Sequence, residues 1–492
     1  MCVAGTAVAE VICRKIDGYA IASAVLQPVT AGSASSLEGR ADRPYAIKVP
    51  LANGVRFDWY DERPPPIPRL LITPEIVERA RKDPADAYAP FFEWNLSFLE
   101  DQRCRGLRPV TMGHLEDVFY FESLDRSKYP AYRHLRHISP PNWFVTNNFG
   151  WRGPDIALNK PPNTIRIAFV GASTTIDAFG APFSHPELVG FWLNRWAQER
   201  HLPYRFEVLN TGRTGIDTHS IAAIVTTELL PVEPDLVVYY EGANQFWPTQ
   251  MIASEQSTRD FEKPRSTYRQ RTVLENYSAL VGRMVRAVEL LSARGDGGEP
   301  PKPPSTINWP DGIDERDPPI DSQKLPMDLP AMLHDLEAMR AALAPIKAEL
   351  IMSSFVWLVH DGMKLDLRRD LTLYDYLNRA YWPVTYSQMR RLADFQNRVF
   401  ARYASAHRLE FIDLAAEYPH DPALAVDAVH FRYPGLVLEG WILLQHLVPL
   451  IEQRVADGRL PKAMQVVHTV HPAFDQPSPR LIRLDAVSPR CH

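Results

Sequence analysis

The sequence is poor in cysteine and in net positive charge, and it has no long apolar run. Its 492 residues include four cysteines, which lie mostly near the chain ends and lack the spacing of zinc ligands. A disulfide framework or a structural zinc site is therefore not expected. With 54 Lys and Arg against 59 Asp and Glu, the formal net charge is -5, so nothing in the charge balance favours nucleic acid as a partner.

No apolar run reaches the roughly 18 residues that a membrane span needs. The N-terminus has a weak signal-like pattern, in which the basic pair Arg14-Lys15 precedes an apolar stretch at 18–27 and small residues at 30–35. Asp17 and the long leader before the basic pair depart from a secretory signal. We therefore favour a cytoplasmic location, with export through this segment as the alternative.

The first part of the chain, residues 1–145, shows no clear alternation of strand and helix patterns and is interpreted as an N-terminal accessory region. Its first 40 or so residues are expected to be flexible. Thr73 followed by Pro74 is typical of a helix start, with the threonine as N-cap. Aromatic residues crowd 89–97 and 118–145, so this region is expected to pack on the rest of the protein.

From residue 146 to about 460 the pattern changes to repeated strand–helix units. The predicted strands are short apolar runs at 164–170, 206–210, 236–240, 350–355 and 409–414. Helical patterns lie near 186–200, 218–230, 278–293, 329–347, 386–407 and 434–455. This alternation predicts a parallel sheet covered by helices on both faces, with the carboxyl ends of all strands at one edge.

One interval breaks this spacing, because more than 100 residues separate the strands at 236–240 and 350–355. Its part at about 292–326 is rich in proline, glycine and acidic residues and is predicted to be a flexible insertion. The insertion is either a lid or substrate-contacting element, or a solvated excursion of the surface. Residues 461–492 are interpreted as a C-terminal tail.

Small and polar residues follow four of the predicted strands. They form the segments Gly171-Ala-Ser-Thr-Thr175, Asn210-Thr-Gly-Arg-Thr-Gly-Ile-Asp-Thr218, Glu241-Gly-Ala-Asn-Gln245 and, further past its strand, Asp427-Ala-Val-His430. Open parallel sheets bind ligands outside the carboxyl ends of their strands. These segments are therefore predicted to meet at one site.

The residue types in these segments suit nucleophilic catalysis. Ser173 supplies a hydroxyl, which is a weak nucleophile without a base within hydrogen-bond reach. His430 can take the proton, and Asp427 can hold the other ring nitrogen and stabilise the imidazolium. The backbone N–H groups of Ser173 and Gly215 and the side-chain amide of Asn244 are candidate donors to an oxyanion.

Each of these residues also has a plain structural explanation. Ser173 alone is a possible helix cap, and Gly215 and Asn244 alone are typical turn residues. A phosphate-binding role for the first segment is disfavoured because it has neither the G-x-G-x-x-G spacing nor a P-loop lysine. The joint order of Ser173, Gly215, Asn244, Asp427 and His430 after successive strands favours the catalytic interpretation.

At these residues the chain resembles the SGNH (GDSL-like) hydrolases, whose four blocks supply Ser, Gly, Asn and His in this order. The resemblance covers roughly residues 145–455, and Asn148-Phe-Gly-Trp-Arg-Gly153 also resembles a segment of bacterial members. It implies a three-layer α/β/α fold with a flavodoxin-like five-stranded parallel sheet. The first block reads Gly-Ala-Ser instead of Gly-Asp-Ser, and the third has Gln245 where the family has Asp, which puts the support of the site in doubt.

Three neighbouring residues are candidates for the substrate pocket. Phe246 and Trp247 follow the third block and either line the pocket or pack in the core. Arg213 either meets an anionic group of the substrate or lies solvated at the surface. The basic run Arg133–His137 is interpreted as a solvated surface rather than a metal or phosphate site.

The combined expectation is a serine esterase that needs no metal and no cofactor. Its partner is a small-molecule or carbohydrate ester, and short acyl groups are slightly favoured because no long apolar segment indicates a lipid-facing surface. An O-acyltransferase would use the same site with another acceptor. A non-catalytic binding protein on the same scaffold is disfavoured by the intact Ser173, His430 and Asp427.

Overall fold

The computed structural model describes residues 2–16, 40–67, 107–111, 118–123, 125–137, 144–177, 181–252, 273–292, 305–365 and 367–469, with a few single residues between these ranges. The predicted helix start at Thr73 lies outside the described residues, as do most of residues 18–35 and the end of the tail.

The centre of the protein is a five-stranded parallel sheet in the order β5-β4-β6-β7-β8. Its strands are β4 (Thr164–Gly171), β5 (Arg205–Asn210), β6 (Leu236–Tyr240), β7 (Glu349–Ser353) and β8 (Glu410–Ile412). All five predicted strands are confirmed, although the last two are shorter than expected. The order is flavodoxin-like, with each crossover helix placing the next strand parallel to its neighbour.

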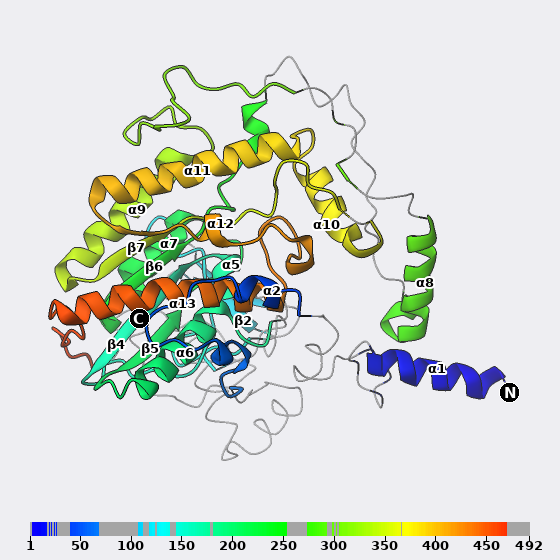
Figure 1. The fold of residues 1–492 in the computed structure, drawn as a ribbon, viewed down its shortest axis with the longest axis horizontal. Helices are drawn as coiled ribbons and strands as arrows, with labels where there is room; N and C mark the ends of the chain where they lie inside the picture. Colours follow the sequence, from blue (N-terminus) through cyan, green and yellow to red (C-terminus); the bar gives the residue numbers. More distant parts are fainter. Residues whose placement is uncertain are drawn as a thin grey trace.

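Helices cover both faces of this sheet, so the fold has three layers (Figure 1). One face carries α6 (His185–Glu199) and α13 (Tyr433–Ala456), which pack against each other. The other carries α7 (Thr218–Ile224), α9 (Leu329–Leu343) and α11 (Tyr386–His407). Capping boxes at Ser184 and Thr385 fix the first turns of α6 and α11 by satisfying their free N–H groups.

The long helix α13 is apolar enough to cross a membrane, with a mean hydropathy of 1.4 over its best window. However, 78% of that window is buried inside the protein, against α6 and its neighbours. This packing is that of a core helix, and no other helix of the described residues meets the same length and hydropathy criteria.

The accessory region contributes a small antiparallel sheet of β1 (Leu107–Thr111), β2 (Val118–Ser123) and β3 (Tyr132–His134). Its aromatic residues do contact the central domain. The Tyr132 hydroxyl donates to the Thr214 carbonyl at 2.8 Å, in the loop that follows β5. Earlier in the chain, after α2 (Arg43–Ala46), the buried Tyr60 ring stacks on Trp192 of α6.

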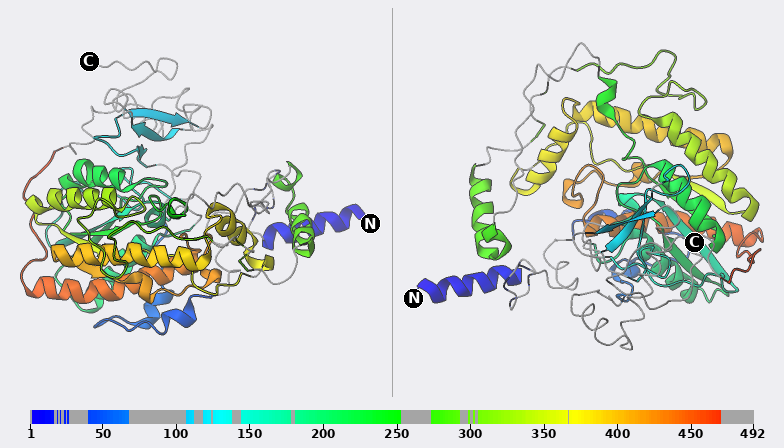
Figure 2. Two further views of the ribbon diagram at one scale, coloured as in Figure 1. Left: turned by 90° about the horizontal axis from the view of Figure 1, so that it is seen from above. Right: turned by 180° about the vertical axis from the view of Figure 1, so that it is seen from behind.

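Two helices contact each other away from the central sheet, with α1 (Cys2–Ile16) crossing the N-terminal end of α8 (Ala279–Ser292) (Figure 2). The Glu10 carboxylate accepts hydrogen bonds from the first backbone N–H groups of α8, at 3.0 Å from Ala279 and 2.9 Å from Leu280. The predicted helix at 278–293 therefore forms, but it pairs with the N-terminus instead of covering the sheet.

The remaining described helices connect these layers. They include α5 (Ser173–Ile176), α10 (Leu367–Ala380), α12 (Leu414–Glu417) and a π-helical turn, Val225–Leu229, that continues α7. Residues 305–326 of the insertion lie along α11. There, Gln388 Nε2 donates to the Ser305 carbonyl at 2.6 Å, and Arg398 Nε donates to the Glu315 carbonyl at 2.6 Å.

Candidate active site

Ser173 lies where β4 ends and the short helix α5 begins, buried with only 5% of its surface exposed. The turn is tight. A Cβ atom at Gly171 would come within 2.0 Å of Thr175 Oγ1 and 2.2 Å of the Tyr240 carbonyl oxygen. Thr175 Oγ1 instead donates to that carbonyl at 2.9 Å, which ties α5 to the end of β6. Glycine at 171 is therefore required by close approach, and the turn fixes the direction of Ser173.

His430 and Asp427 lie on the loop before α13 and form a chain of contacts with Ser173. His430 Nε2 lies 2.7 Å from Ser173 Oγ, and His430 Nδ1 lies 2.7 Å from Asp427 Oδ2. Both distances are those of strong hydrogen bonds. The imidazole therefore bridges hydroxyl and carboxylate through its two ring nitrogens, the arrangement in which a base is held in the tautomer that can accept a serine proton.

The second oxygen of Asp427 fixes the loop itself. Asp427 Oδ1 accepts the backbone N–H groups of Val429 and His430, each at 2.9 Å. Burial raises the pKa of Asp427, but the hydrogen bond from His430, its charge and these two N–H groups outweigh burial and lower the pKa below its ordinary value. The carboxylate therefore stays ionised at neutral pH, as the support of an imidazolium requires.

The two further blocks are also brought together at this edge of the sheet. Gly215 has φ of +71°, a conformation that glycine adopts without strain, and no heavy atom lies within 4 Å of the position its Cβ would occupy. Asn244 Nδ2 donates to the carbonyl of Ile216 at 2.6 Å, so the third block is bonded to the residue after Gly215. A small cavity of about 10 Å³, the size of one water, lies beside Ser173 and His430.

The chain departs from the family pattern at Gln245, and the structure gives this amide a partner. Gln245 Oε1 accepts the backbone N–H of Thr218, the first residue of α7, at 2.9 Å, and also the hydroxyl of Thr218. The neutral side chain thus links the third block to the helix after the second.

The three residues proposed for the substrate pocket, Phe246, Trp247 and Arg213, lie in three different environments. Phe246 is buried and packs on Trp357 with ring centroids 4.3 Å apart, whereas Trp247 is 52% exposed. Arg213 is neither at a substrate surface nor solvated. Its guanidinium is buried in an ion pair with Glu228 and donates to the Tyr132 carbonyl at 2.7 Å.

The basic run at 133–137 is likewise not a solvated surface throughout, because Arg133 is 3% exposed and pairs with Glu228 at 3.0 Å. Burial raises the pKa of Glu228, but the two arginines outweigh it and lower the pKa to about 2. The two guanidinium groups therefore share one buried carboxylate, and Arg213 is held inside the protein by this contact. The sequence alone does not predict this ion pair, because Arg133 and Glu228 are 95 positions apart.

One buried acidic residue beside the third block is not among the candidates drawn from the sequence. Glu241 follows β6 directly, is 2% exposed, and its Oε1 accepts the backbone N–H groups of Ala243 and Asn244. Burial raises its pKa to about 7. The available signal was an acidic residue placed immediately after a buried strand and three positions before the candidate oxyanion residue.

Among the described residues, one group of carboxylates and imidazole lies close enough to hold a cation: Asp177, His185 and Glu439, with ligand atoms within 4.8 Å of one another. Asp177 Oδ2 already accepts the backbone N–H of His185 at 2.8 Å and lies 2.9 Å from its Nδ1. Burial lowers the pKa of His185, but Glu439 and Asp177 outweigh it and raise the pKa. Burial also raises the pKa of Glu439. Asp177 and Glu439 therefore both face the buried His185 ring and favour its protonated form.

A scan against protein-family models and a search of the curated proteins each found no match. Among solved structures, the chain is similar to a GDSL-like lipase from Bacteroides thetaiotaomicron, at 12% identity over 61% of this chain and 93% of that chain, with a TM-score of 0.28. It is also similar to a lipase/acylhydrolase from Enterococcus faecalis, at 19% identity over 61% and 100% of the two chains, with a TM-score of 0.30.

A third similar structure is a catalytic mutant of an acetylxylan esterase from Geobacillus stearothermophilus, at 16% identity over 57% of this chain and 94% of that chain, with a TM-score of 0.31. These TM-scores are all below 0.5, so the function proposed below rests on the residues of this chain.

Proposed function

We propose that this chain is a serine esterase that cleaves a carboxylic ester through Ser173, His430 and Asp427. The observation that carries the proposal is the unbroken pair of 2.7 Å contacts from Ser173 Oγ through the imidazole to Asp427 Oδ2. A helix cap or a turn residue would need no such base behind the hydroxyl.

In the acylation half-reaction, Ser173 Oγ attacks the ester carbonyl carbon while His430 Nε2 accepts the hydroxyl proton. The resulting imidazolium is stabilised by the ionised Asp427. Collapse of the tetrahedral intermediate breaks the bond to the alcohol oxygen, which takes the proton from His430. Water, deprotonated by the same imidazole, then attacks the acyl-enzyme and releases the acid and free Ser173.

Three donors serve the negative oxygen of both tetrahedral intermediates, namely the backbone N–H groups of Ser173 and Gly215 and the Asn244 amide. An amide NH₂ has two hydrogens. The bond of Asn244 Nδ2 to the Ile216 carbonyl uses one and orients the group, which leaves the other for the oxyanion. Donors fixed before the reaction stabilise the developing charge without reorganising.

A polar cleft supports a polar alcohol portion for the substrate. The cleft, of about 1070 Å³, borders Gln245, the residue after Asn244. Its lining combines residues of the insertion with α7 and α9 and is rich in amide, imidazole and carboxylate groups: His219, Gln250, Asn308, Gln323, Asp328, His334 and Asp335. Such groups suit a substrate with many hydroxyls, so we favour a carbohydrate O-acyl ester with a short acyl group over a lipid ester.

The experiment is hydrolysis of p-nitrophenyl esters from acetate to palmitate by the wild type, by Ser173→Ala, and by Ser405→Ala as a control on the exposed end of α11. We expect activity to be highest with acetate, to fall in Ser173→Ala by about 10³-fold or more, and to be unchanged in Ser405→Ala. Equal activity of the wild type and Ser173→Ala would contradict the proposal.

The same assay with added sugars separates hydrolysis from acyl transfer, because both share the acyl-enzyme. Free acid as the main product supports the esterase. An acylated sugar as the main product would assign the site to an O-acyltransferase.

A further inference from the structure

We propose that Glu241 is a positioning residue whose buried carboxylate holds the turn Gly242–Asn244 in the shape that presents the Asn244 amide to the oxyanion. This role rests on the proposed esterase function. It concerns a residue that does not touch the reacting atoms and acts through another side chain.

The side chain of Glu241 folds back over the turn that follows it. Its Oε1 accepts the backbone N–H of Ala243 at 2.7 Å and that of Asn244 at 2.8 Å. Two hydrogen bonds that end on one carboxyl oxygen fix both peptide planes. Because Glu241 is buried and both bonds are partly buried, loss of this acceptor would leave two N–H groups without their partner, at a cost that favours another loop conformation.

The rest of the turn is held from two other elements. Gln396 of α11 is fully buried, and its Nε2 donates to the Gly242 carbonyl at 2.7 Å. The Asn244 amide is anchored at the Ile216 carbonyl at 2.6 Å. The backbone of the turn is therefore fixed by α11 on one side and by Glu241 from within, and the side chain of Asn244 is aimed from that backbone.

The charge of Glu241 fits the same role. Burial raises its pKa to about 7, against the opposing effects of the backbone N–H groups and of His430. The titratable groups that interact electrostatically with the carboxyl include His430 and the buried Tyr239. His430 becomes positive as Ser173 loses its proton, so an ionised Glu241 also stabilises the charge that develops there.

The test compares two substitutions of similar size. Glu241→Met removes the acceptor, and we expect kcat to fall by about 10²-fold, the scale of losing one oxyanion donor, with KM changed by less than about threefold. Glu241→Gln keeps an oxygen acceptor and should retain kcat within about tenfold of the wild type. Glu207→Gln, a carboxyl at the other end of the sheet, is the matched control with unchanged kcat.

A double-mutant cycle shows whether Glu241 acts through Asn244. If it does, Glu241→Met combined with Asn244→Ala should have the kcat of Asn244→Ala alone, within about threefold. If the double variant instead loses kcat by the product of the two single losses, the positioning role is overturned. A wild-type kcat in Glu241→Met would also overturn it. If Glu241→Met does not fold, Glu241→Asp takes its place. It keeps the charge but shortens the side chain by one methylene, and an unchanged kcat there would overturn the role.

The proposed function and this inference fail in different ways. Absence of Ser173-dependent turnover in the wild type would overturn both. Normal Ser173-dependent turnover together with wild-type kinetics in the Glu241 variants would overturn the positioning role alone.

Discussion

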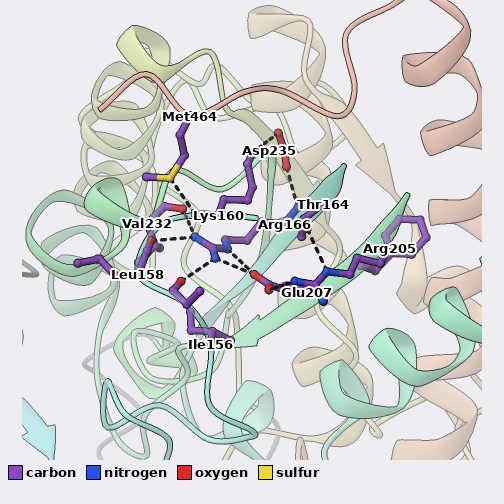
Figure 3. A network of polar contacts seen from close by, with 12 residues as sticks. Ile156, Leu158, Lys160, Thr164, Arg166, Arg205, Glu207, Val232, Asp235 and Met464 are labelled. Carbon is purple, nitrogen blue, oxygen red and sulfur yellow. Dashed lines mark hydrogen bonds and ion pairs between the residues drawn. The ribbon is translucent and has the colours of Figure 1, made fainter. Parts of the chain in front are cut away.

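The two ends of the central sheet hold buried polar groups in opposite ways. At the amino end, Arg166 in β4, Glu207 in β5 and Asp235 just before β6 form a closed network with Lys160 (Figure 3). Lys160 Nζ lies 2.7 Å from Asp235 Oδ1, and Arg166 Nη2 lies 2.7 Å from Glu207 Oε2. Asp235 Oδ2 also accepts the backbone N–H of Arg166 at 2.7 Å. Each charge in this network has a partner of opposite sign.

At the carboxyl end, the polar groups form an open chain. Asp427 is bonded to His430 and His430 to Ser173, and the chain stops at the serine hydroxyl. Glu241 lies beneath the same edge, and burial raises its pKa to about 7. The polar groups at the two ends of the sheet therefore have different roles. Closed ion pairs hold the strands together at the amino end, whereas the groups at the carboxyl end are fixed on one side and available for chemistry on the other.

The largest effect is expected from breaking the hydrogen-bonded chain of Asp427, His430 and Ser173. His430→Ala removes the base, so kcat/KM should fall by about 10³-fold or more. The midpoint of urea unfolding should move less than on loss of a buried ion pair, because Asp427 keeps the backbone N–H groups of Val429 and of residue 430 as partners. His446→Ala, on an exposed imidazole paired with Glu417, is the control and should leave both values unchanged. A large loss of stability without loss of rate would reverse the contrast between the two ends.

Breaking the closed network should give the opposite result. Asp235→Ala leaves Lys160 as an uncompensated buried charge, and we expect the free energy of unfolding to fall by about 3–5 kcal/mol. The kcat of the folded protein should stay within about twofold. Urea unfolding and ester hydrolysis measure the two quantities.

The control for this network is Arg205→Ala. This arginine is 59% exposed and 3.5 Å from Glu207, so its loss should cost less than about 1 kcal/mol. Equal losses in Asp235→Ala and Arg205→Ala would show that burial does not set the strength of this network.

A smaller effect concerns the pH dependence of stability. The pKa of Glu241 is about 7 in the folded protein against an ordinary value of 4.5, so the folded state keeps a proton that the unfolded state releases. Stability from this group is therefore fully present below pH 4.5 and is lost as the pH rises to about 7. Glu241→Gln should reduce that loss by on the order of 1–3 kcal/mol. The measurement is urea unfolding at several pH values.

Glu228 should affect the pH dependence of stability in the opposite direction to Glu241. Its pKa is lowered to about 2, so its ion pairs contribute stability above pH 4.5 that is lost as the pH falls toward 2. Glu228→Gln should flatten the acid limb of the stability profile and leave the limb between pH 4.5 and 7 as it is. A variant that changed the neutral limb instead would contradict the assignment of these two windows.

The smallest expected effect is at Trp247, which is 52% exposed beside the third block. Trp247→Ala should change the free energy of unfolding by no more than about 0.5 kcal/mol. If the ring contacts the substrate, KM should rise by about 2- to 10-fold with kcat retained. Val467→Ala, at a side chain 77% exposed in the C-terminal segment, is the control. An unchanged KM would remove Trp247 from the substrate surface.

Much of the fold could be predicted from local pattern. Leu236–Tyr240 and the helix at 386–407 were predicted with their observed bounds, because a buried parallel strand is a continuous apolar run and a long amphipathic helix has a clear period. The strands β1–β3 were missed, since they are short and one of them contains Pro109. The helix α10 was also missed, and its backbone departs from helical geometry at Asp370.

The site was predictable to the extent that its residues follow strands. Ser173, Gly215 and Asn244 are each within a few positions of a strand end, so the topology alone predicts that they meet. Arg213 and Glu241 were misjudged or missed because their partners depend on packing. Arg213 forms an ion pair with a carboxylate 15 positions later and donates a hydrogen bond to a backbone carbonyl of an accessory strand 81 positions earlier. Glu241 folds back over its own turn, and its place between a buried strand and Asn244 indicates that contact only weakly.

The most direct test of the central claim is labelling with a fluorophosphonate, followed by peptide mapping in a mass spectrometer. The proposed mechanism predicts one covalent adduct, on Ser173, that forms rapidly in the wild type and far more slowly in His430→Ala. An adduct on another residue, or ester hydrolysis by a protein that takes up no label at Ser173, would contradict it.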